Sequence, residues 1–367
     1  MSNPLVSLGK LGQSPWYDFI TRDLVQSGKL RRLIEDDGLM GMTSNPTIFE
    51  KAISSSDLYD EDISKLTADG KNAAEVFESI AVADVQSACD AFQPVYERTR
   101  GVDGVVSLEV SPTLARDTDG TIAEAERLWK RVARPNVMIK IPGTVEGLEA
   151  ITRCLAGGIN VNVTLLFSVA RHAEVIEAFF RGIEQRAAVG EPVDRVVSVA
   201  SFFVSRVDGR VDAELDKRGD PSKLRGTIAI ANAAAAYALF EAEFKGPRWE
   251  KLVARGAQVQ RPLWASTSTK DPKYPDTYYV DALIAPHTVN TLPPETFAAF
   301  ADHGKAVVRI RDAMSKAPAR LEALAGCGID LAAIATFLEN DGVAKFAASY
   351  ASLLAGIDAK AHALSAR

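Results

Sequence analysis

Short apolar runs rich in β-branched residues alternate along this chain with longer segments of helical periodicity. Eight runs predict strands, at residues 14–20, 39–45, 104–110, 136–141, 159–167, 196–204, 261–269 and 280–286. Strands that alternate with helices predict a parallel sheet of the α/β class. Because eight strands are the number that closes a (β/α)8 TIM barrel, we favour that fold over an open doubly wound sheet, whose glycine fingerprint for dinucleotides is absent.

Helix signals occupy the segments between these runs. Residues 226–244 are rich in alanine, and residues 171–187 carry a stripe of apolar side chains at helical spacing. Thr47 with Glu50, and Thr121 with Glu124, have the spacing of capping boxes. From residue 287 onward the pattern predicts helices only, with no linker before them. We therefore expect one domain, residues 1–367, in which residues ~287–367 form a helical C-terminal extension packed on the barrel.

Composition and charge exclude several classes of function. Among 367 residues, 47% are hydrophobic and 25% are charged, which is ordinary for a globular protein, and the net charge of −6 comes without a basic block. We expect no nucleic-acid partner, and no membrane partner either, since no apolar run reaches the ~18 residues of a membrane span. The N-terminus lacks the pattern of a signal peptide, so a cytoplasmic location is expected.

The cysteines and histidines do not cluster. Three cysteines and four histidines are scattered along the sequence, so neither a disulfide framework nor a zinc site is indicated, and we expect no metal and no cofactor. We assign His172 and His287 to structural roles. The composition carries no signal for the oligomeric state.

The feature that needs an explanation is Lys140, which stands in the middle of the apolar run "NVMIKI". Lysine is rarely buried without a partner, because removing an ammonium group from water is costly. Side chains alternate across a strand, so Lys140 shares the barrel interior with Met138, while Val137, Ile139 and Ile141 face the helices. The lysine is therefore predicted to point into the barrel.

The same alternation gives the other strands a polar interior face near their carboxyl ends. The interior pairs are Ser107 with Glu109, Thr43 with Asn45, Asn162 with Thr164, Ser201 with Phe203, and Ser266 with Ser268. Active sites of such barrels form at the carboxyl ends of the strands, where a purely structural interior would hold branched apolar residues. These side chains are therefore predicted to form a site around Lys140.

One lysine with carboxylates, amides and hydroxyls suits covalent amine catalysis on a carbonyl compound. Burial disfavours the charged form of a lysine, and the free amine can attack a ketone to give a Schiff base. The resulting iminium withdraws electrons from the neighbouring carbon–carbon bond and makes its cleavage feasible. Glu109 is placed to pass protons through a water held by Thr164, and a second carboxylate would serve the hydroxyl that becomes an aldehyde.

Each of these residues also has a structural interpretation. Lys140 and Glu109 would form a buried ion pair without catalysis, and Asn45 before Pro46 is typical of a turn. Asp18 would start a helix, and Arg206 would be a solvated surface charge, although an arginine near a strand end suits phosphate. No single residue decides between the two interpretations.

Five motifs taken together resemble the transaldolase family over nearly the whole chain, in particular its longer bacterial form with an extended helical C-terminus. The motifs are "GMTSNPTIFEKAI", "VSLEVSP", "VMIKIPGT", "INVNVTLLFS" and "SVASFFVSRVD", in the order the family has them. The resemblance implies a cofactor-free transferase of the pentose phosphate pathway. It would move a dihydroxyacetone unit from sedoheptulose 7-phosphate to glyceraldehyde 3-phosphate, giving erythrose 4-phosphate and fructose 6-phosphate.

The resemblance also implies a role for each matched residue. Lys140 would form the Schiff base, Glu109 and Thr164 would hold the catalytic water, and Asp18, in "SPWYDFI", would be the acid and base for the hydroxyl beside the cleaved bond. The substrate-binding residues implied are Asn45 and Asn162 for the hydroxyls of the dihydroxyacetone unit, Ser201 and Arg206 for the phosphate, and Phe203 for the pocket wall.

This sequence departs from shorter members of the family in the seventh strand segment. Where they carry a second phosphate-binding arginine, this chain has Ser268, with Lys270 two residues further on. We expect Lys270 or a nearby backbone amide to replace that arginine, although lysine binds phosphate as a point charge and cannot form the bidentate fork.

Two rival functions fit parts of the same pattern. A lysine-dependent aldolase would release free dihydroxyacetone, because water instead of an acceptor aldehyde resolves its intermediate. A non-catalytic sugar-phosphate-binding barrel would keep the fold without turnover. The joint presence of the lysine, glutamate, asparagine and threonine disfavours the second rival.

Overall fold

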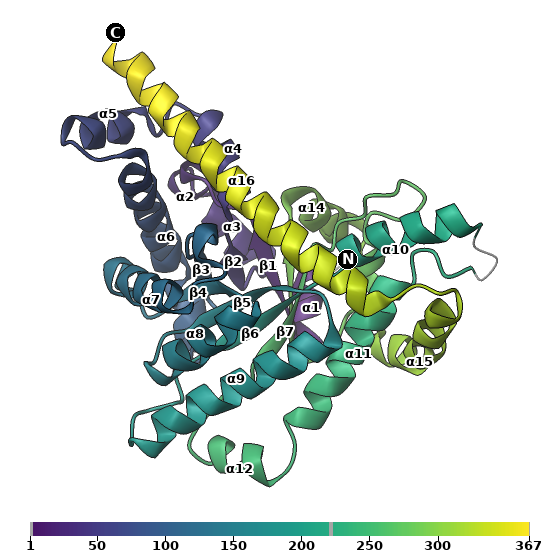
Figure 1. Ribbon diagram of the computed structural model, residues 1–367. Coiled ribbons are helices and arrows are strands. Elements are labelled where there is room, and N and C mark those ends of the chain that lie inside the picture. The colour runs from purple at the N-terminus through teal and green to yellow at the C-terminus, as the bar shows by residue number, and fades with distance from the viewer. Residues whose placement is uncertain (1–2, 220–222, 367) are drawn as a thin grey trace.

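The computed structural model describes residues 3–219 and 223–366, and it contains a closed barrel of parallel strands with helices around it (Figure 1). The strand order is β1-β2-β3-β4-β5-β6-β7-β8, which confirms the predicted (β/α)8 fold. The strands are β1 (Gln13–Asp18), β2 (Gly41–Thr43), β3 (Val105–Glu109), β4 (Val137–Pro142), β5 (Val161–Leu166), β6 (Ser198–Phe203), β7 (Arg261–Ala265) and β8 (Thr288–Leu292).

The helices form an outer layer and a long C-terminal arm. In chain order they are α1 (Pro4–Lys10), α2 (Arg22–Gln26), α3 (Lys29–Asp36), α4 (Pro46–Ser54), α5 (Asp60–Ala68), α6 (Ala73–Arg98), the 3-10 helix η1 (Pro112–Leu114), α7 (Thr118–Val132), α8 (Val145–Ala156), α9 (Val169–Ala188), α10 (Ser205–Arg218), α11 (Ile228–Glu243), α12 (Pro247–Val253), α13 (Tyr278–Ala282), α14 (Pro294–His303), α15 (Ile310–Gly326) and α16 (Leu331–Ser365).

The register between neighbouring strands brings the predicted site residues into one row. Glu109 on β3 lies opposite Lys140 on β4, and Lys140 lies opposite Asn162 on β5. On the strands that precede β3 around the barrel, Asp18 of β1 lies opposite Thr43 of β2. Because paired residues of parallel strands point to the same side, the register alone places these side chains together inside the barrel.

The prediction for the eighth strand is wrong. Residues 280–286 form the end of α13 and a buried loop that contains Leu283 and Ile284, while the strand is Thr288–Leu292. The apolar run at 280–286 is buried as part of the core without pairing in the sheet, and a short buried run cannot be assigned to strand or loop from hydrophobicity alone. The helical tail therefore begins at Pro294 with α14, later than predicted.

The two capping-box predictions are also wrong. The N-cap of α4 is Asn45, whose side chain accepts a hydrogen bond from the backbone N–H of Ile48, and the N-cap of α7 is Asp117. Thr47 instead bonds to Ser349 of α16 through the two hydroxyls. Asparagine and aspartate are at least as good N-caps as threonine, so each helix starts at the earlier residue.

The helix α16 crosses the barrel at the carboxyl ends of the strands, as the long yellow helix of Figure 1 shows. It contacts α4, η1 and α10, which follow β2, β3 and β6, and it also reaches β5. A Cβ atom on Gly342 would lie 2.8 Å from a methyl group of Leu165, so a larger residue here would require the Leu165 side chain to shift. The tail therefore covers the end of the barrel where the site lies.

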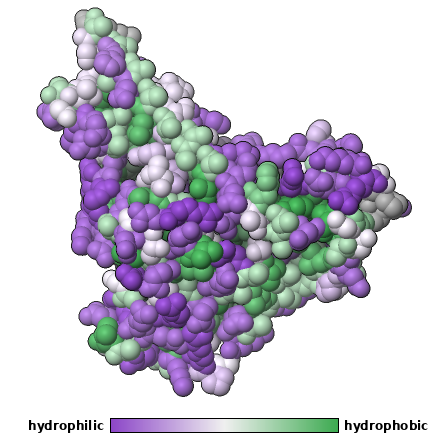
Figure 2. Space-filling view, viewed as in Figure 1, coloured by the Kyte–Doolittle hydropathy of each residue, from purple (hydrophilic) through white to green (hydrophobic). Residues whose placement is uncertain are grey.

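The surface around α16 is mixed. In Figure 2 hydrophilic residues dominate the face seen, and hydrophobic residues lie along the projecting end of α16. Among the described residues, no single helix is long and apolar enough to span a membrane; α15 and α16 pass that test of length and composition only as a pair bent by 92°.

The opposite end of the barrel is closed by a buried ion pair. The guanidinium of Arg261 lies 2.9 Å from the carboxylate of Asp103, and both side chains are more than nine-tenths buried. Asp103 also accepts hydrogen bonds from the hydroxyl of Ser14 and the indole N–H of Trp16. These contacts tie the start of β7 to β1 and to the turn before β3.

Replacing Asp103 with alanine is expected to destabilise the fold by about 3–5 kcal/mol, because the buried charge of Arg261 then has no counterion. Asp90 offers a matched control, since its ion pair with Arg134 is 2.6 Å long but 57% of the aspartate side chain is exposed. Asp90→Ala is expected to cost less than ~1 kcal/mol. Denaturant unfolding measures both values, and equal losses in the two variants would contradict the assignment.

Candidate active site

A cavity with a volume of about 250 Å³ lies at the carboxyl ends of the strands, beneath α16. Seven of the nine predicted site residues line it. They are Asp18, Asn45, Lys140, Thr164, Ser201, Phe203 and Arg206. The other two, Glu109 and Asn162, are fully or almost fully buried beside it and contact residues of its wall. The structure therefore gathers all nine predicted residues in one place.

Lys140 occupies the centre of this arrangement. It is 5% exposed and lies in a strand whose residues are all buried. Its Nζ donates a hydrogen bond of 3.2 Å to the backbone carbonyl of Ser44 and lies 3.5 Å from Oε2 of Glu109. The ring of Phe346, from α16, lies 5.8 Å from the same nitrogen. The amine is thus held by two oxygen acceptors and covered by an aromatic ring.

Glu109 is a carboxyl group in an environment that disfavours its charge. Burial raises the pKa of Glu109 to about 6, even though the nearby ammonium of Lys140 acts in the opposite direction. Apart from the ion pair with Lys140, neither carboxylate oxygen has a hydrogen-bond partner among the described residues. A carboxyl group with a pKa near neutrality can both donate and accept a proton at physiological pH.

A second carboxyl group faces the cavity from β1. Asp18 accepts a hydrogen bond of 2.6 Å from the hydroxyl of Thr43, and that hydroxyl lies 2.7 Å from the hydroxyl of Thr291. Burial raises the pKa of Asp18, against the opposing effect of Lys140 and of the Thr43 hydrogen bond. Asp18 is therefore a second proton-transfer group on a different wall from Glu109.

Asn162 is held rigidly between two strands. Its amide nitrogen donates to the hydroxyl of Ser107, and its carbonyl oxygen accepts from the hydroxyl of Ser201 at 2.6 Å. Since the proton of Ser201 is used in this bond, that hydroxyl must rotate before it can donate to a bound anion. The two predicted ligands Asn162 and Ser201 are thus coupled.

Asn45 and Thr164 present free polar groups to the cavity. The side-chain oxygen of Asn45 caps α4, which leaves its amide N–H groups for other acceptors. The hydroxyl of Thr164 is buried and has no partner among the described residues. A buried hydroxyl without a partner is unusual, and a bound water or substrate would satisfy it.

Cationic side chains line the same cavity. The guanidinium of Arg206 lies 5.0 Å from the ring centroid of Phe203, and its Nη1 is buried without a partner in the described part of the chain. Lys270 donates a hydrogen bond of 2.8 Å to the hydroxyl of Ser268, and both residues line the cavity. Lys51 adds a further charge from α4. The cavity therefore suits an anionic ligand.

Sequence reasoning missed several residues of the cavity, among them two that carry a charge and one aromatic residue. Thr291 and Glu295 were missed because the eighth strand was placed too early, and correct placement would have put Thr291 on the interior face. Lys51 lies in a helix, where its charge gives no sign of where it points. Phe346 comes from a helix far along the chain, and no local pattern links it to Lys140.

The described residues offer no metal site, since no group of three or more histidine, cysteine, aspartate or glutamate side chains is placed to hold an ion. His172 is fully buried beside the ring of Phe202, and burial lowers its pKa to about 4. It lies in α9, outside the cavity, as a neutral core residue.

A barrel that gathers a buried lysine, two carboxyl groups, amides and cations at the carboxyl ends of its strands has the arrangement of an enzyme that acts on anionic carbonyl compounds. Comparison with known proteins gives the same class. Residues 15–357 match the family model described as transaldolase/fructose-6-phosphate aldolase. The chain belongs to this family, which confirms the resemblance noted in its motifs.

Curated relatives cover almost the whole chain. The protein named "Transaldolase" from Acidothermus cellulolyticus is 51% identical over 97% of this chain and 96% of its own length. "Transaldolase" from Frankia alni is also 51% identical, over 97% of both chains, and "Transaldolase 2" from a Nostoc species is 45% identical over 99% of both. Similarity of this extent covers the barrel and the helical tail alike.

The raised pKa of Glu109 predicts how stability depends on pH. The carboxyl group binds its proton more tightly in the folded chain than in the unfolded one. Its stabilising contribution to the free energy of unfolding is therefore full below the ordinary pKa of 4.5 and is lost as the pH rises through the folded-state pKa of about 6. Between about pH 4 and about pH 7, the wild type should lose ~2 kcal/mol relative to Glu109→Gln. Urea unfolding of both proteins at each pH measures this difference, and a pH-independent difference would contradict it.

Proposed function

We propose that this protein is a transaldolase that moves a dihydroxyacetone unit from sedoheptulose 7-phosphate to glyceraldehyde 3-phosphate, giving erythrose 4-phosphate and fructose 6-phosphate. The observation that carries the proposal is the buried amine of Lys140, 3.5 Å from a carboxyl group whose pKa is about 6. Family membership and relatives named "Transaldolase" at 45–51% identity support it.

The first step of this reaction is the attack of Lys140 on the ketone carbon of the donor sugar. Nζ forms a bond to that carbon, and the ketone oxygen becomes a hydroxyl group of a carbinolamine. Glu109, in its protonated form, supplies the proton with which this oxygen leaves as water, and a carbon–nitrogen double bond forms. Thr164 holds a water for this proton transfer, since its buried hydroxyl otherwise has no partner.

The second step is the cleavage of the carbon–carbon bond, for which Asp18 is the base. Asp18 takes the proton of the hydroxyl next to the bond that breaks, and the electron pair of that bond moves to the positively charged iminium nitrogen. The aldehyde product leaves, and the three-carbon unit stays on Lys140. Thr43 donates a hydrogen bond to the carboxylate of Asp18, and Thr291 bonds in turn to the hydroxyl of Thr43.

The remaining residues bind the substrate. Asn45 and Asn162 bind the hydroxyl groups of the dihydroxyacetone unit through their amides. Arg206 binds the phosphate with its unpartnered guanidinium nitrogen, and Ser201 assists after its hydroxyl rotates away from Asn162. Phe203 forms the wall beside Arg206.

The barrel and the helical tail act as one domain in this proposal. Phe346 of α16 covers the nitrogen of Lys140, and Glu339 of the same helix lies 3.1 Å from Arg116 of the barrel layer. Excluding water above the amine keeps the intermediate from premature hydrolysis.

Sodium borohydride reduction in the presence of fructose 6-phosphate is expected to trap a covalent three-carbon or six-carbon adduct on Lys140, which peptide mass mapping locates. Lys140→Met should form no adduct and lose activity by a factor of at least ~1000, because the residue carries the covalent step. Lys130, an exposed residue of α7, offers a matched control, and Lys130→Met should keep full activity.

Adduct formation by Lys140→Met, or full activity of that variant, would refute the mechanism. Product analysis separates the rival aldolase: without an acceptor aldehyde, a transaldolase releases little free dihydroxyacetone, whereas steady release with no acceptor would identify the aldolase. A chain with neither turnover nor adduct would be a binding protein.

Lys270 is proposed to replace the second phosphate-binding arginine of shorter family members. Lys270→Ala is expected to raise the KM for sugar phosphates about tenfold with little change in kcat, since a charge-assisted phosphate contact contributes ~1.5 kcal/mol. Lys273→Ala, in the same loop but outside the cavity, should leave the KM unchanged. An unchanged KM in Lys270→Ala would remove Lys270 from the phosphate site.

A further inference from the structure

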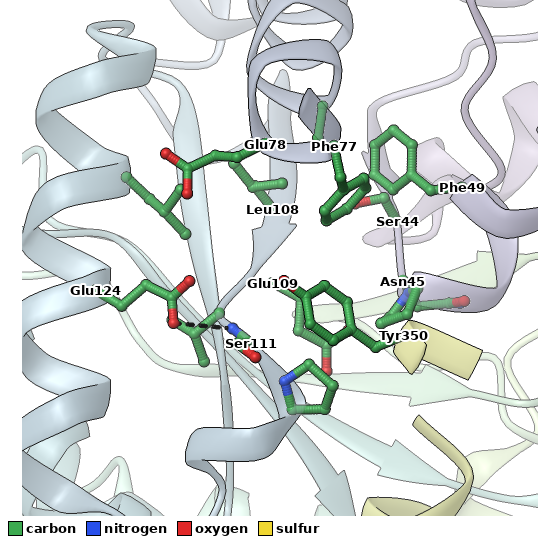
Figure 3. A pocket seen from close by; sticks show the side chains of 15 residues that line it. Ser44, Asn45, Phe49, Phe77, Glu78, Leu108, Glu109, Ser111, Glu124 and Tyr350 are labelled. Atoms are coloured by element: carbon green, nitrogen blue, oxygen red, sulfur yellow. Dashed lines mark hydrogen bonds between the residues drawn. The ribbon is translucent and has the colours of Figure 1, made fainter. Parts of the chain in front are cut away.

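A second cavity lies behind the active site, on the far side of Glu109 from the substrate. It has a volume of about 30 Å³, room for about two water molecules, between the carboxyl ends of β2 and β3 and the helices α4, α6, α7 and α16. Figure 3 looks into this side cavity, with Glu124 and Ser111 on one side and Phe49 and Phe77 on the other. The side cavity and the substrate cavity share only Asn45 among their lining residues.

The two proposed catalytic residues, Lys140 and Glu109, line different cavities. Lys140 lines the substrate cavity, and Glu109 lines the side cavity. Both carboxylate oxygens of Glu109 are buried and have no hydrogen-bond partner among the described residues other than the ion pair with Lys140. A buried carboxyl group beside this cavity, with no other protein partner, points to water as its partner, since buried polar groups are satisfied in nearly all proteins.

Polar groups continue from Glu109 through the side cavity to the surface. Ser111 donates its backbone N–H to Glu124 at 3.1 Å, and the hydroxyl of Tyr350 interacts with the side chain of Ser111. At the outer end, the side chains of Glu78 and Glu124 are 16% and 18% exposed and pair with Arg127. Water in such a space finds the two to four polar partners that it needs.

The remaining wall is apolar. Phe49, Phe77, Leu108 and Leu128 line the side cavity together with Ala81. The apolar wall offers water no hydrogen bonds, so water is held only along the polar wall from Glu109 to the outer end. The side cavity therefore has the properties of a conduit, with a polar line of residues along one wall and no tight binding site.

We propose that the side cavity is a water chamber through which the water of the Schiff-base steps leaves and returns. This inference rests on the proposed function. When Lys140 condenses with the ketose, the carbon–oxygen bond of the carbinolamine breaks, Glu109 gives its proton to that oxygen, and one water forms. The bound sugar phosphate fills the substrate cavity, so this water moves past Glu109 into the side cavity. In the reverse step a water returns, adds to the iminium carbon, and gives a proton back to Glu109.

The chamber gives the water of the Schiff-base steps a path that does not cross the bound substrate. Phe346 lies over the nitrogen of Lys140, and the three-carbon intermediate must meet an acceptor aldehyde there before water. With a separate route, Glu109 exchanges its proton and its water with solvent away from the substrate cavity.

Filling the chamber tests the proposal without touching Lys140, Glu109 or the substrate cavity. Ala81 is a buried residue of α6 on the chamber wall, and Ala81→Leu places three additional carbon atoms there. Leu128→Phe fills the chamber from α7 and provides a second variant should the first fail to fold. Ala88→Leu is the matched control, because Ala88 is a fully buried alanine of the same helix that lies off the chamber wall.

The readout is the rate at which the borohydride-trapped adduct on Lys140 appears after rapid mixing with fructose 6-phosphate. In Ala81→Leu and Leu128→Phe, adduct formation should be about tenfold slower, equivalent to ~1.4 kcal/mol in the barrier. The final fraction trapped should equal that of the wild type, because formation and hydrolysis use the same route. Exchange of the ketose carbonyl oxygen with heavy-oxygen water should slow by the same factor, and Ala88→Leu should match the wild type in both assays.

Wild-type rates in folded Ala81→Leu and Leu128→Phe would overturn the chamber, as would equal slowing in Ala88→Leu, which would mark a general packing effect. In both cases the wild type still forms the adduct, so the proposed function stands. Failure of the wild type to form any adduct on Lys140 would instead overturn the proposed function, and the chamber with it. A crystal structure with ordered waters beside Glu109 in the wild type and none in Ala81→Leu would support the chamber, and a dry wild-type cavity would refute it.

Discussion

The burial of one lysine beside one glutamate is the constraint on which the rest of this structure depends. Lys140 and Glu109 lie opposite each other on neighbouring strands, 3.5 Å apart, with almost no exposure to solvent. Removing two such groups from water is costly, and a single ion pair does not recover the whole cost. The fold tolerates the pair because the barrel supplies a carbonyl of Ser44 for the amine and a cavity for the carboxyl group.

The two ends of the barrel have different roles: contacts at one end stabilise the fold, and residues at the other end form the candidate active site. At the amino ends of the strands, Arg261, Asp103 and Trp16 are joined by a buried ion pair and hydrogen bonds, while the side-chain oxygens of Gln13, Asn136 and Gln260 lack partners among the described residues. At the carboxyl ends, Glu109, Thr164 and Arg206 keep buried polar atoms without partners among the described residues. Such unsatisfied groups reduce stability, and they are retained where substrate and water are expected to bind.

Much of the fold and the site was predictable from the sequence, because successive side chains of a strand point to opposite faces of the sheet. Once Lys140 is assigned to the interior, alternation assigns Asn162, Thr164 and Ser201 to the interior as well, and the structure places them there. The eighth strand was misplaced because "VDALIAP" is more apolar than "TVNTL". An apolar run indicates that a segment is buried, but it does not show whether the segment pairs in a sheet. The capping-box predictions failed because Asn45, two residues before Thr47, and Asp117, four residues before Thr121, are the actual caps.

The kind of barrel, the position of the reactive amine and the set of polar groups around it can be predicted from the sequence, because they follow from local periodicity and residue chemistry. The residues that enclose them become known only from the folded chain. The contact of Phe346 with Lys140, the approach of Gly342 to Leu165 and the chamber behind Glu109 join residues separated by long stretches of chain. Such contacts depend on the path of α16 across the barrel, and that path is set by packing against several elements at once, which no local pattern encodes.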